Sequence, residues 1–237
     1  MSDYDRLTVD SPSPVARFNH RTRFDRTARL IEELADKNAS VLDYGCGDGR
    51  LLSDLRARGW QGALLGYDAF VDDQKPGFEK IADLDAVADA SLDIIGAFEA
   101  LEHMDDEARA EFLEFCARAL KPSGRIVVSV PIMIGPVLFL KYANARIVNG
   151  SPWRYSPGEL IRAGIFWGSV PRSKSGKYMD HKGFDYRELK REIAARFKFV
   201  RSFFSPFPAL GAAFNSQIFM VFADADQLTE IAARTLS

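Results

Sequence analysis

The sequence contains little cysteine and little histidine, the residues on which disulfide frameworks and many metal sites depend. Its 237 residues include 2 cysteines and 3 histidines. The cysteines, Cys46 and Cys116, lie in different predicted elements and give neither a disulfide framework nor the spacing of a zinc site. We therefore predict a protein of a reducing compartment, the cytoplasm, that binds no metal.

Long apolar runs and a leader segment are also missing. The most apolar stretch, residues 126–140, is interrupted by Pro131 and Pro136 and is shorter than the ~20 residues that a membrane-spanning helix needs. Residues 1–14 are polar and contain proline, which does not fit a signal peptide. An apolar content of 47% and a charged content of 27% are typical of a globular chain with a sizeable core.

The net charge of -2 excludes no class of binding partner, but the charges are unevenly distributed along the chain. Residues 72–114 contain 14 acidic and 3 basic side chains, whereas residues 154–201 contain 12 basic and 5 acidic ones. The basic segment favours an anionic small molecule or surface as its partner, and a solvated basic face is the alternative. A nucleic-acid partner is not favoured, because no long basic stripe interleaves with aromatic residues outside this segment.

The most informative motif spans residues 41–52, which read VLDYGCGDGRLL. An apolar run containing Asp43 leads into glycines at alternate positions, among them Gly45 and Gly47, and a helix is predicted to follow. Glycine lacks a Cβ, so the backbone can turn tightly and approach a ligand closely. The first N–H groups of the helix would point into the same crevice. This arrangement is typical of a nucleotide-type cofactor site at the carboxyl end of a first strand.

The spacing of the glycines distinguishes between cofactors. A dinucleotide motif, G-x-G-x-x-G, would require glycine where the chain has Arg50. The carboxylate of Asp43 would repel a pyrophosphate and attract the amino group of a methionine moiety. The D-x-G-x-G-x-G segment resembles motif I of class I S-adenosylmethionine-dependent methyltransferases. The resemblance implies S-adenosyl-L-methionine as cofactor, bound through Asp43, Gly45, Cys46 and Gly47.

Acidic residues also follow the next two predicted strands. Asp68 lies 23 residues beyond Gly45, close to the ~20-residue interval at which an acid reaches a ribose diol. We expect Asp68 and its neighbour Ala69 at the cofactor. The family resemblance implies that Asp83 accepts a hydrogen bond from the adenine amino group, whereas Asp85 is expected to cap the short helix that follows.

A second family motif follows the fourth predicted strand. Residues 98–104 read FEALEHM, which resembles the corresponding motif of small-molecule methyltransferases of the ubiquinone and sugar type. The resemblance implies that Phe98 lies along the cofactor and that Glu99 and His103 lie at or near the catalytic face. His181 resembles a histidine that faces the cleft in this family. His103, His181 and Glu99 are therefore the candidate catalytic residues, and purely structural roles for the histidines are the alternative.

The order of the predicted elements indicates an α/β fold. We predict a doubly wound, mostly parallel seven-stranded sheet with a C-terminal antiparallel hairpin, the fold of class I methyltransferases. The chain, residues 1–237, is expected to form a single methyltransferase domain. A cap helix over about 15–36 would bring Arg23 or Arg21 to the cofactor, as the resemblance implies. An insertion over about 132–180 would form the substrate lid.

The predicted activity is in-line transfer of a methyl group to a small acceptor. The basic and aromatic lid suits an anionic or lipid-linked acceptor, while a small satellite core is an alternative role for the lid aromatics. Peripheral membrane contact is a further option, since the apolar run beginning at Val137 is flanked by Lys141 and Arg146. An NAD-dependent oxidoreductase and a non-catalytic binding module are the alternative functions. The sequence gives no prediction of oligomeric state.

Overall fold

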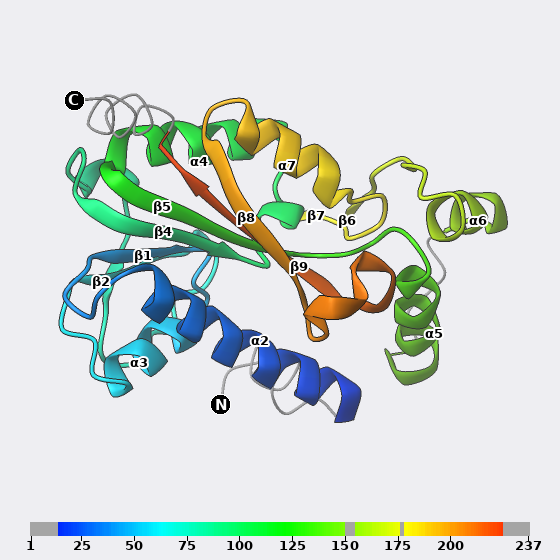
Figure 1. The fold of residues 1–237 in the computed structure, drawn as a ribbon, viewed down its shortest axis with the longest axis horizontal. Helices are drawn as coiled ribbons and strands as arrows, with labels where there is room; N and C mark the ends of the chain where they lie inside the picture. Colours follow the sequence, from blue (N-terminus) through cyan, green and yellow to red (C-terminus); the bar gives the residue numbers. More distant parts are fainter. Residues whose placement is uncertain (1–13, 150–154, 176–177, 225–237) are drawn as a thin grey trace.

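The computed structural model describes residues 14–149, 155–175 and 178–224. A seven-stranded sheet with the order β3-β2-β1-β4-β5-β9-β8 forms its centre (Figure 1). Its strands are β1 (Val41–Tyr44), β2 (Leu64–Tyr67), β3 (Glu79–Ile81), β4 (Leu92–Phe98), β5 (Leu120–Pro131), β8 (Lys198–Ser205) and β9 (Gln217–Ala223). The first five pair in parallel, and β9 pairs antiparallel with both β5 and β8. The predicted fold class is confirmed.

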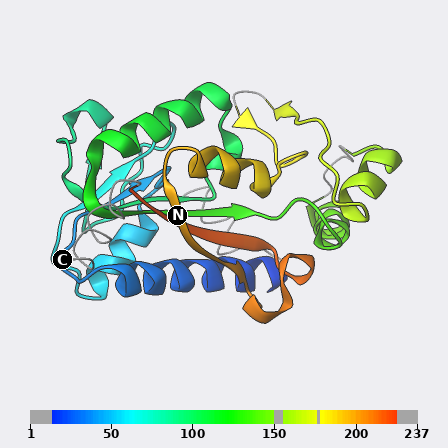
Figure 2. The same ribbon diagram turned by 45° about the horizontal axis from the view of Figure 1, so that its top comes forward.

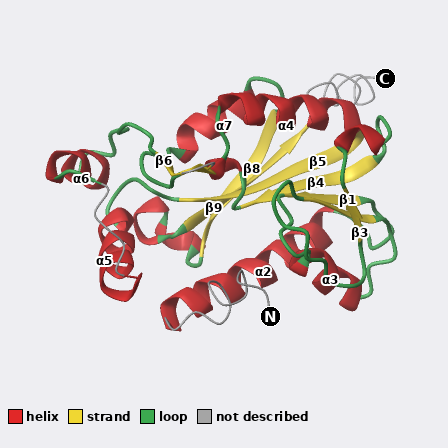
Figure 3. Cartoon of the chain, turned by 180° about the vertical axis from the view of Figure 1, so that it is seen from behind, coloured by secondary structure: helices red, strands yellow, loops and turns green. Residues whose placement is uncertain are grey.

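Helices cover both faces of the sheet, as Figures 1 and 2 show. The helices α2 (Pro14–Leu34) and α3 (Arg50–Ala57) lie on one face. The helices α4 (Asp106–Ala119) and α7 (Tyr186–Ala194) lie on the other. Two further helices, α5 (Val137–Asn149) and α6 (Pro157–Gly164), lie at one end of the molecule beyond the sheet (Figure 3).

The central strands bury both of their faces, and neighbouring residues contribute to different cores. Val41 and its register partner Ile94 belong to the core beneath α2 and α3. Leu42 and its partner Ile95 belong to the core beneath α4 and α7. Side chains alternate between the two faces of a strand, so a strand covered by helices on both sides must be apolar throughout. Strand β9 is covered on both faces in the same way, and every one of its residues is buried.

The structure differs from the sequence prediction in the middle of the chain. Residues 121–125 include a proline and a glycine and predict a break between a helix and a strand that starts at Ile126, but β5 already begins at Leu120, directly after α4. Leu120 pairs with Leu92, and a register shift between Leu92 and Ile94 accommodates the extra residues. A bulge of this kind inserts residues without ending a strand, so the proline and glycine of this segment are compatible with strand pairing.

Residues 171–178 of the insertion over 132–180 are polar and predict a loop, but the structure has a short antiparallel hairpin there. Its strands are β6 (Lys174–Ser175) and β7 (Tyr178–Met179). Nearby, the predicted capping box at the start of α6 is present: Ser156 and Glu159 cap one another's backbone. At α7 the N-cap Asp185 accepts from the backbone N–H of Arg187. The predicted terminal helix over 226–236 lies outside the described residues.

Candidate active site

The glycine turn after β1 adopts a backbone conformation that most residues avoid. Gly45 has a φ of 80° and Gly47 a φ of 56°, values that glycine adopts without steric cost. A Cβ on Gly45 would lie 2.7 Å from the Cβ of Ala100, whereas a Cβ on Gly47 would meet no atom within 4 Å. The N–H groups of Gly45 and Cys46 donate to the carbonyl of Tyr67, at 2.8 and 3.1 Å. The turn is thus fixed to the end of β2 and leaves space beside Gly47.

Gly45→Ala should therefore destabilise the protein more than Gly47→Ala. Both substitutions place a side chain at positive φ, which costs about 1–3 kcal/mol, but only the first also overlaps the Cβ of Ala100. Differential scanning calorimetry should show the larger fall in Tm for Gly45→Ala, and the Gly47→Ala variant is the matched control. Equal Tm values for the two variants would contradict the steric role assigned to Gly45.

A pocket lies beside this turn, with an empty volume of about 380 Å³ that includes space open to solvent. Its lining comes from α2, β1, the glycine turn, α3 and the end of β4, and consists of Arg23, Phe24, Thr27, Asp43, Gly45, Cys46, Asp48, Arg50, Leu51 and Phe98. The predicted cofactor residues Arg23, Asp43, Gly45, Cys46 and Phe98 are therefore brought together.

Asp43 is the unusual group of this pocket. Its carboxyl is buried, and its Oδ1 accepts no hydrogen bond from any described residue. Its pKa is raised to about 7, first by burial and then by the nearby Asp68, while Arg23 acts in the opposite direction. A buried carboxyl with a free acceptor is costly unless a partner satisfies it. The side chain therefore fits a pocket that receives a cationic group of a ligand.

Arg23 reaches the pocket from α2. Its side chain is buried, and Nη1 lies 3.8 Å from the Glu99 carboxylate. Glu99 directly follows β4 and has a φ of 55°, a conformation rarely adopted by non-glycine residues. Strained residues of this kind are concentrated at functional sites. The side chain of the alternative candidate, Arg21, lies outside the described residues.

Asp68 connects the glycine turn to the loop after β2. Its Oδ2 accepts from the N–H of Gly47 at 2.8 Å. Its Oδ1 accepts from the N–H groups of Phe70 and Val71, at 2.9 and 3.0 Å. Each carboxylate oxygen can accept more than one hydrogen bond, so acceptor capacity remains for a ribose. Ala69, the other residue predicted here, is exposed.

After β3 the capping residue is Asp83 and not the predicted Asp85. Asp83, and not Asp85, is the N-cap of the 3-10 helix η1 (Leu84–Ala86): its Oδ1 accepts from the Asp85 N–H at 2.9 Å. The prediction that Asp85 caps this helix is therefore wrong. Side chains that accept at an N-cap must precede the first helical N–H groups, which is the position of Asp83. Asp83 is exposed and is not among the residues that line the described pocket.

Cys46 and Phe98 contribute shape more than polarity. Burial, followed by the neighbouring Asp43 and Asp68, raises the pKa of the Cys46 thiol, so it stays protonated and is a poor nucleophile. The ring of Phe98 covers Gly96, where a Cβ would lie 2.3 Å from the Phe98 ring. The glycine in β4 thus allows this aromatic ring to lie flat against the strand at the edge of the pocket.

The two candidate catalytic histidines, far apart in sequence, meet in the structure. Their Nε2 atoms are 3.1 Å apart, and the ring centroids of His103 and His181 are 4.7 Å apart. The Nδ1 of His103 lies 3.0 Å from the carbonyl oxygen of Met179 in β7. A carbonyl only accepts, so His103 carries its proton on Nδ1 and its Nε2 has a free electron pair. The pKa of His181 is lowered to about 3, first by desolvation of its ring and then by the neighbouring His103, which makes His181 a weak general base.

Glu102, close to the two histidines, is a polar group that was not among the site residues predicted from the sequence. Its side chain is fully buried, and neither carboxylate oxygen accepts a hydrogen bond from a described residue. Oε1 lies 3.9 Å from the Nε2 atom of His103 and 3.9 Å from that of His181. Burial and the nearby Glu99 raise its pKa well above the ordinary value. The only signal in the sequence was its place within the segment FEALEHM.

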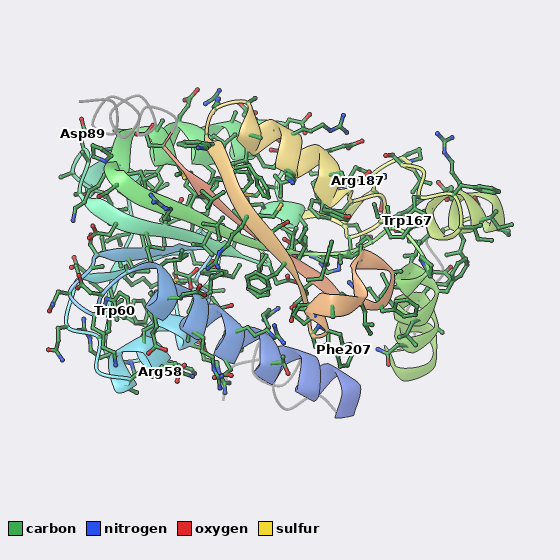
Figure 4. All side chains as sticks on the ribbon, viewed as in Figure 1. Arg58, Trp60, Asp89, Trp167, Arg187 and Phe207 are labelled. Atoms are coloured by element: carbon green, nitrogen blue, oxygen red, sulfur yellow. The ribbon has the colours of Figure 1, made fainter. Side chains whose placement is uncertain are left out.

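The insertion over 132–180 is attached to the central sheet and its helices by several polar contacts. Arg187 of α7 donates to the carbonyl of Trp167 at 2.7 Å, and Figure 4 labels both residues. Arg172 donates to the carbonyls of Glu102 and Asp180. The lid also has a small apolar core of its own, formed by Leu138, Tyr155, Ala163 and Val170. Of the aromatic residues of the insertion, Tyr155 therefore serves packing in this small core, whereas Phe166 is exposed.

The comparisons with known proteins agree with this geometry. The methyltransferase-domain family matches residues 16–189, and the chain belongs to this family. The family predicted from the sequence is therefore confirmed.

Two groups of curated relatives share this part of the chain. A probable S-adenosylmethionine-dependent methyltransferase of Mycobacterium tuberculosis is 35% identical over 118 residues, covering 46% of this chain and 42% of its own. A ubiquinone biosynthesis O-methyltransferase of Xylella fastidiosa is 39% identical over 115 residues, covering 42% of this chain and 45% of its own. The chain thus spans less than half the length of these relatives.

Solved structures share the fold over most of the chain. A Pyrococcus horikoshii protein covers 94% of this chain and 99% of its own, with a TM-score of 0.58 and 14% identity. A Burkholderia thailandensis N1-methyltransferase, solved with 1,6-didemethyltoxoflavin and S-adenosylhomocysteine, covers 86% of this chain and 79% of its own, with a TM-score of 0.54 and 17% identity. At such identities the likeness concerns the fold alone.

Proposed function

We propose that the protein is an S-adenosylmethionine-dependent methyltransferase acting on a small acceptor. The observation that carries this proposal is the buried carboxyl of Asp43, which has a free acceptor atom in a pocket beside the glycine turn. The family match and the named relatives support the same cofactor. A carboxyl that needs a cationic partner suits the amino group of this cofactor and does not suit the pyrophosphate of a dinucleotide.

The pocket residues have separate tasks in this proposal. Asp43 holds the amino group, and Arg23 is close enough to hold the carboxylate of the same moiety. Asp68 accepts from the ribose hydroxyls, Asp83 from the adenine amino group, and Phe98 covers the cofactor from β4. When bound, S-adenosylmethionine supplies an activated methyl group on its sulfonium sulfur. The chain therefore has to orient the acceptor in line with that group and exclude water.

The acceptor is proposed to be apolar in part, or lipid-linked. The helices α5 and α6 and the connection between β8 and β9 lie at one end of the molecule (Figure 1). This end carries exposed apolar side chains. They are Phe139, Leu140, Ile161, Ile165, Phe166, Phe207, Leu210 and Phe214. The α5 helix contacts both α6 and the 3-10 helix η4 (Ala212–Phe214), which makes this end one continuous region. An apolar surface of this kind suits contact with a lipid or an apolar substrate.

An anionic acceptor has less support. Lys174 lies 3.7 Å from Asp105, and Lys182 lies 2.9 Å from Glu159. Arg172 donates to backbone carbonyls of the chain itself. These basic lid residues are thus partly neutralised or satisfied within the protein. Among the described residues, no helix is both long and apolar enough to cross a membrane, and the cytoplasmic location stays a prediction.

A melting experiment separates the proposed function from the oxidoreductase alternative. S-adenosylhomocysteine at 100 times its Kd should raise Tm by about 5 °C or more, because a ligand stabilises the state that binds it. NADH should leave Tm unchanged, and the reverse result would overturn the proposal. Incubation with methyl-labelled cofactor and a lipid or aqueous extract then tests turnover. If the protein binds the cofactor but transfers label to no compound of the lipid or the aqueous extract, the non-catalytic binding module is favoured.

A further inference from the structure

A cluster of three potential metal ligands lies where β4 ends. Glu102, His103 and His181 each direct one ligand atom into the cluster, and these atoms all lie within 4.8 Å of one another. The two Nε2 atoms are 3.1 Å apart. Two nitrogens bound to the same ion at about 2.0–2.1 Å would lie roughly 3 Å apart. The histidine pair therefore already has the separation that a shared ion requires.

The surroundings of the cluster support a ligand there independently of that spacing. Glu102 is fully buried, yet neither of its carboxylate oxygens has a hydrogen-bond donor among the described residues. An unpaired carboxylate in such a place is costly, and a cation would satisfy it. Glu99 also has a buried oxygen, Oε1, that accepts no hydrogen bond from a described residue. Two carboxylates with unused acceptors thus belong to the same short segment after β4.

The orientation of His103 is that of a metal ligand. Its Nδ1–H donates to the carbonyl oxygen of Met179 at 3.0 Å, which leaves the Nε2 electron pair directed toward the cluster. Metal-binding histidines usually donate their second ring N–H to a carbonyl or carboxylate, because this fixes the tautomer and the ring orientation. Met179 is in the β6–β7 hairpin, so the lid supplies this contact together with His181.

We propose that Glu102, His103 and His181 bind a divalent transition-metal cation such as Mn²⁺ or Zn²⁺. Imidazole and carboxylate together suit such ions, whereas Mg²⁺ prefers a shell of oxygens. Three protein ligands leave positions open for a substrate atom. The sequence analysis predicted no metal, because it considered only cysteine spacing and could not bring residues 103 and 181 together.

The site has a consequence for the acceptor, which rests on the proposed methyltransferase function. Glu99 lies 3.8 Å from Arg23 of the cofactor pocket and precedes Glu102 by three positions, so the cation site adjoins that pocket. A bound cation lowers the pKa of a hydroxyl that coordinates it. The acceptor hydroxyl would give its proton to solvent, and its oxygen would bond to the methyl carbon. The carbon–sulfur bond would break with its electron pair remaining on sulfur. The acceptor class is therefore a hydroxyl compound.

A metal-free account of the same residues makes a different prediction. In that account His181 donates from Nε2 to Nε2 of His103, and the buried Lys141 and Arg23 offset the charge of Glu102. Lys141 donates to the carbonyl of Ser216 at 2.7 Å, so its ammonium is already held by the chain. The metal-free account predicts no specific uptake of a cation, which a titration can decide.

The test is calorimetric titration of the untagged, chelator-treated protein with MnCl₂, followed by electron paramagnetic resonance of bound Mn²⁺. We expect one equivalent to bind to the wild-type protein. His181→Asn and Glu102→Gln should each weaken the binding by about tenfold or more. His20→Ala is the matched control, because it removes the third histidine of the sequence and should bind as wild type does. ZnCl₂ in place of MnCl₂ should give the same ranking.

Absence of binding in the wild type, or binding that survives both substitutions, would overturn the metal site. His181 is about two-fifths exposed at its side chain, so the His181→Asn variant keeps the test valid if Glu102→Gln fails to fold in a circular-dichroism melt. Titration with S-adenosylhomocysteine is performed in parallel on the same samples. If the wild-type protein does not bind S-adenosylhomocysteine, the proposed function is rejected. If it binds S-adenosylhomocysteine but not Mn²⁺, only the metal site is rejected.

Discussion

Asp68→Ala should weaken the binding of S-adenosylhomocysteine by at least about 100-fold. A hydrogen bond to a charged group contributes about 1.5–3 kcal/mol, and a ribose diol would offer two of them to the same carboxylate. The substitution also removes the acceptor of the Gly47 N–H, at 2.8 Å, and so loosens the glycine turn on which the rest of the cofactor lies. Isothermal titration calorimetry measures the loss directly.

The variant Asp72→Ala provides the matched control. It removes an exposed acid from the same loop and changes the local charge equally, so it should leave the affinity within about twofold because exposed charges interact weakly across solvent. Asp68→Asn should fall between the two, since one amide oxygen still accepts. Unchanged affinity in Asp68→Ala would remove Asp68 from the cofactor site.

The parts of the site that could be predicted lie in short segments at the ends of consecutive strands. In a parallel sheet the carboxyl ends of the strands meet at one edge. The position in space of a local motif such as Asp43 with Gly45 and Gly47 can therefore be predicted from its place after a strand. The register between β1 and β4 then follows from apolar residues that alternate between two buried faces. For this reason the sheet and half of the residues that line the pocket could be expected from the sequence.

The parts that could not be predicted depend on contacts between distant segments. The meeting of His103 with His181 requires the lid hairpin to fold back over the end of β4, and its polar residues gave no strand signal. The capping of η1 by Asp83 in place of Asp85 depends on where a three-residue helix begins, which local propensity does not fix. The continuation of β5 through residues 121–125 depends on pairing with β4 and on a bulge.

The ionisation of Asp43 gives a second large effect, on both stability and binding. Its pKa is raised to about 7 by burial, then by Asp68, and Arg23 opposes the rise. The folded protein therefore retains a proton that the unfolded chain loses at a lower pH. By linkage, this group reduces stability progressively as pH rises from the ordinary carboxyl pKa toward 7, and the penalty is constant above that. Asp43→Asn should remove the penalty and raise Tm by roughly 3 °C or more at pH 7.5 without ligand.

The same substitution should have the opposite effect on cofactor binding. A cationic amino group needs the ionised carboxyl, so the wild-type affinity for S-adenosylhomocysteine should fall by up to about tenfold for each pH unit below 7. Between roughly pH 5.5 and 7.5 the amino group itself stays protonated. Asp43→Asn should bind weakly at every pH in this range and lose most of the pH dependence. Calorimetry in buffers of different ionisation enthalpy should detect proton release on binding to the wild type at pH 6, and none in Asp43→Asn. A pH-independent wild-type affinity would show that Asp43 does not hold the amino group, and a variant that is both less stable and tighter in binding would reverse the assignment.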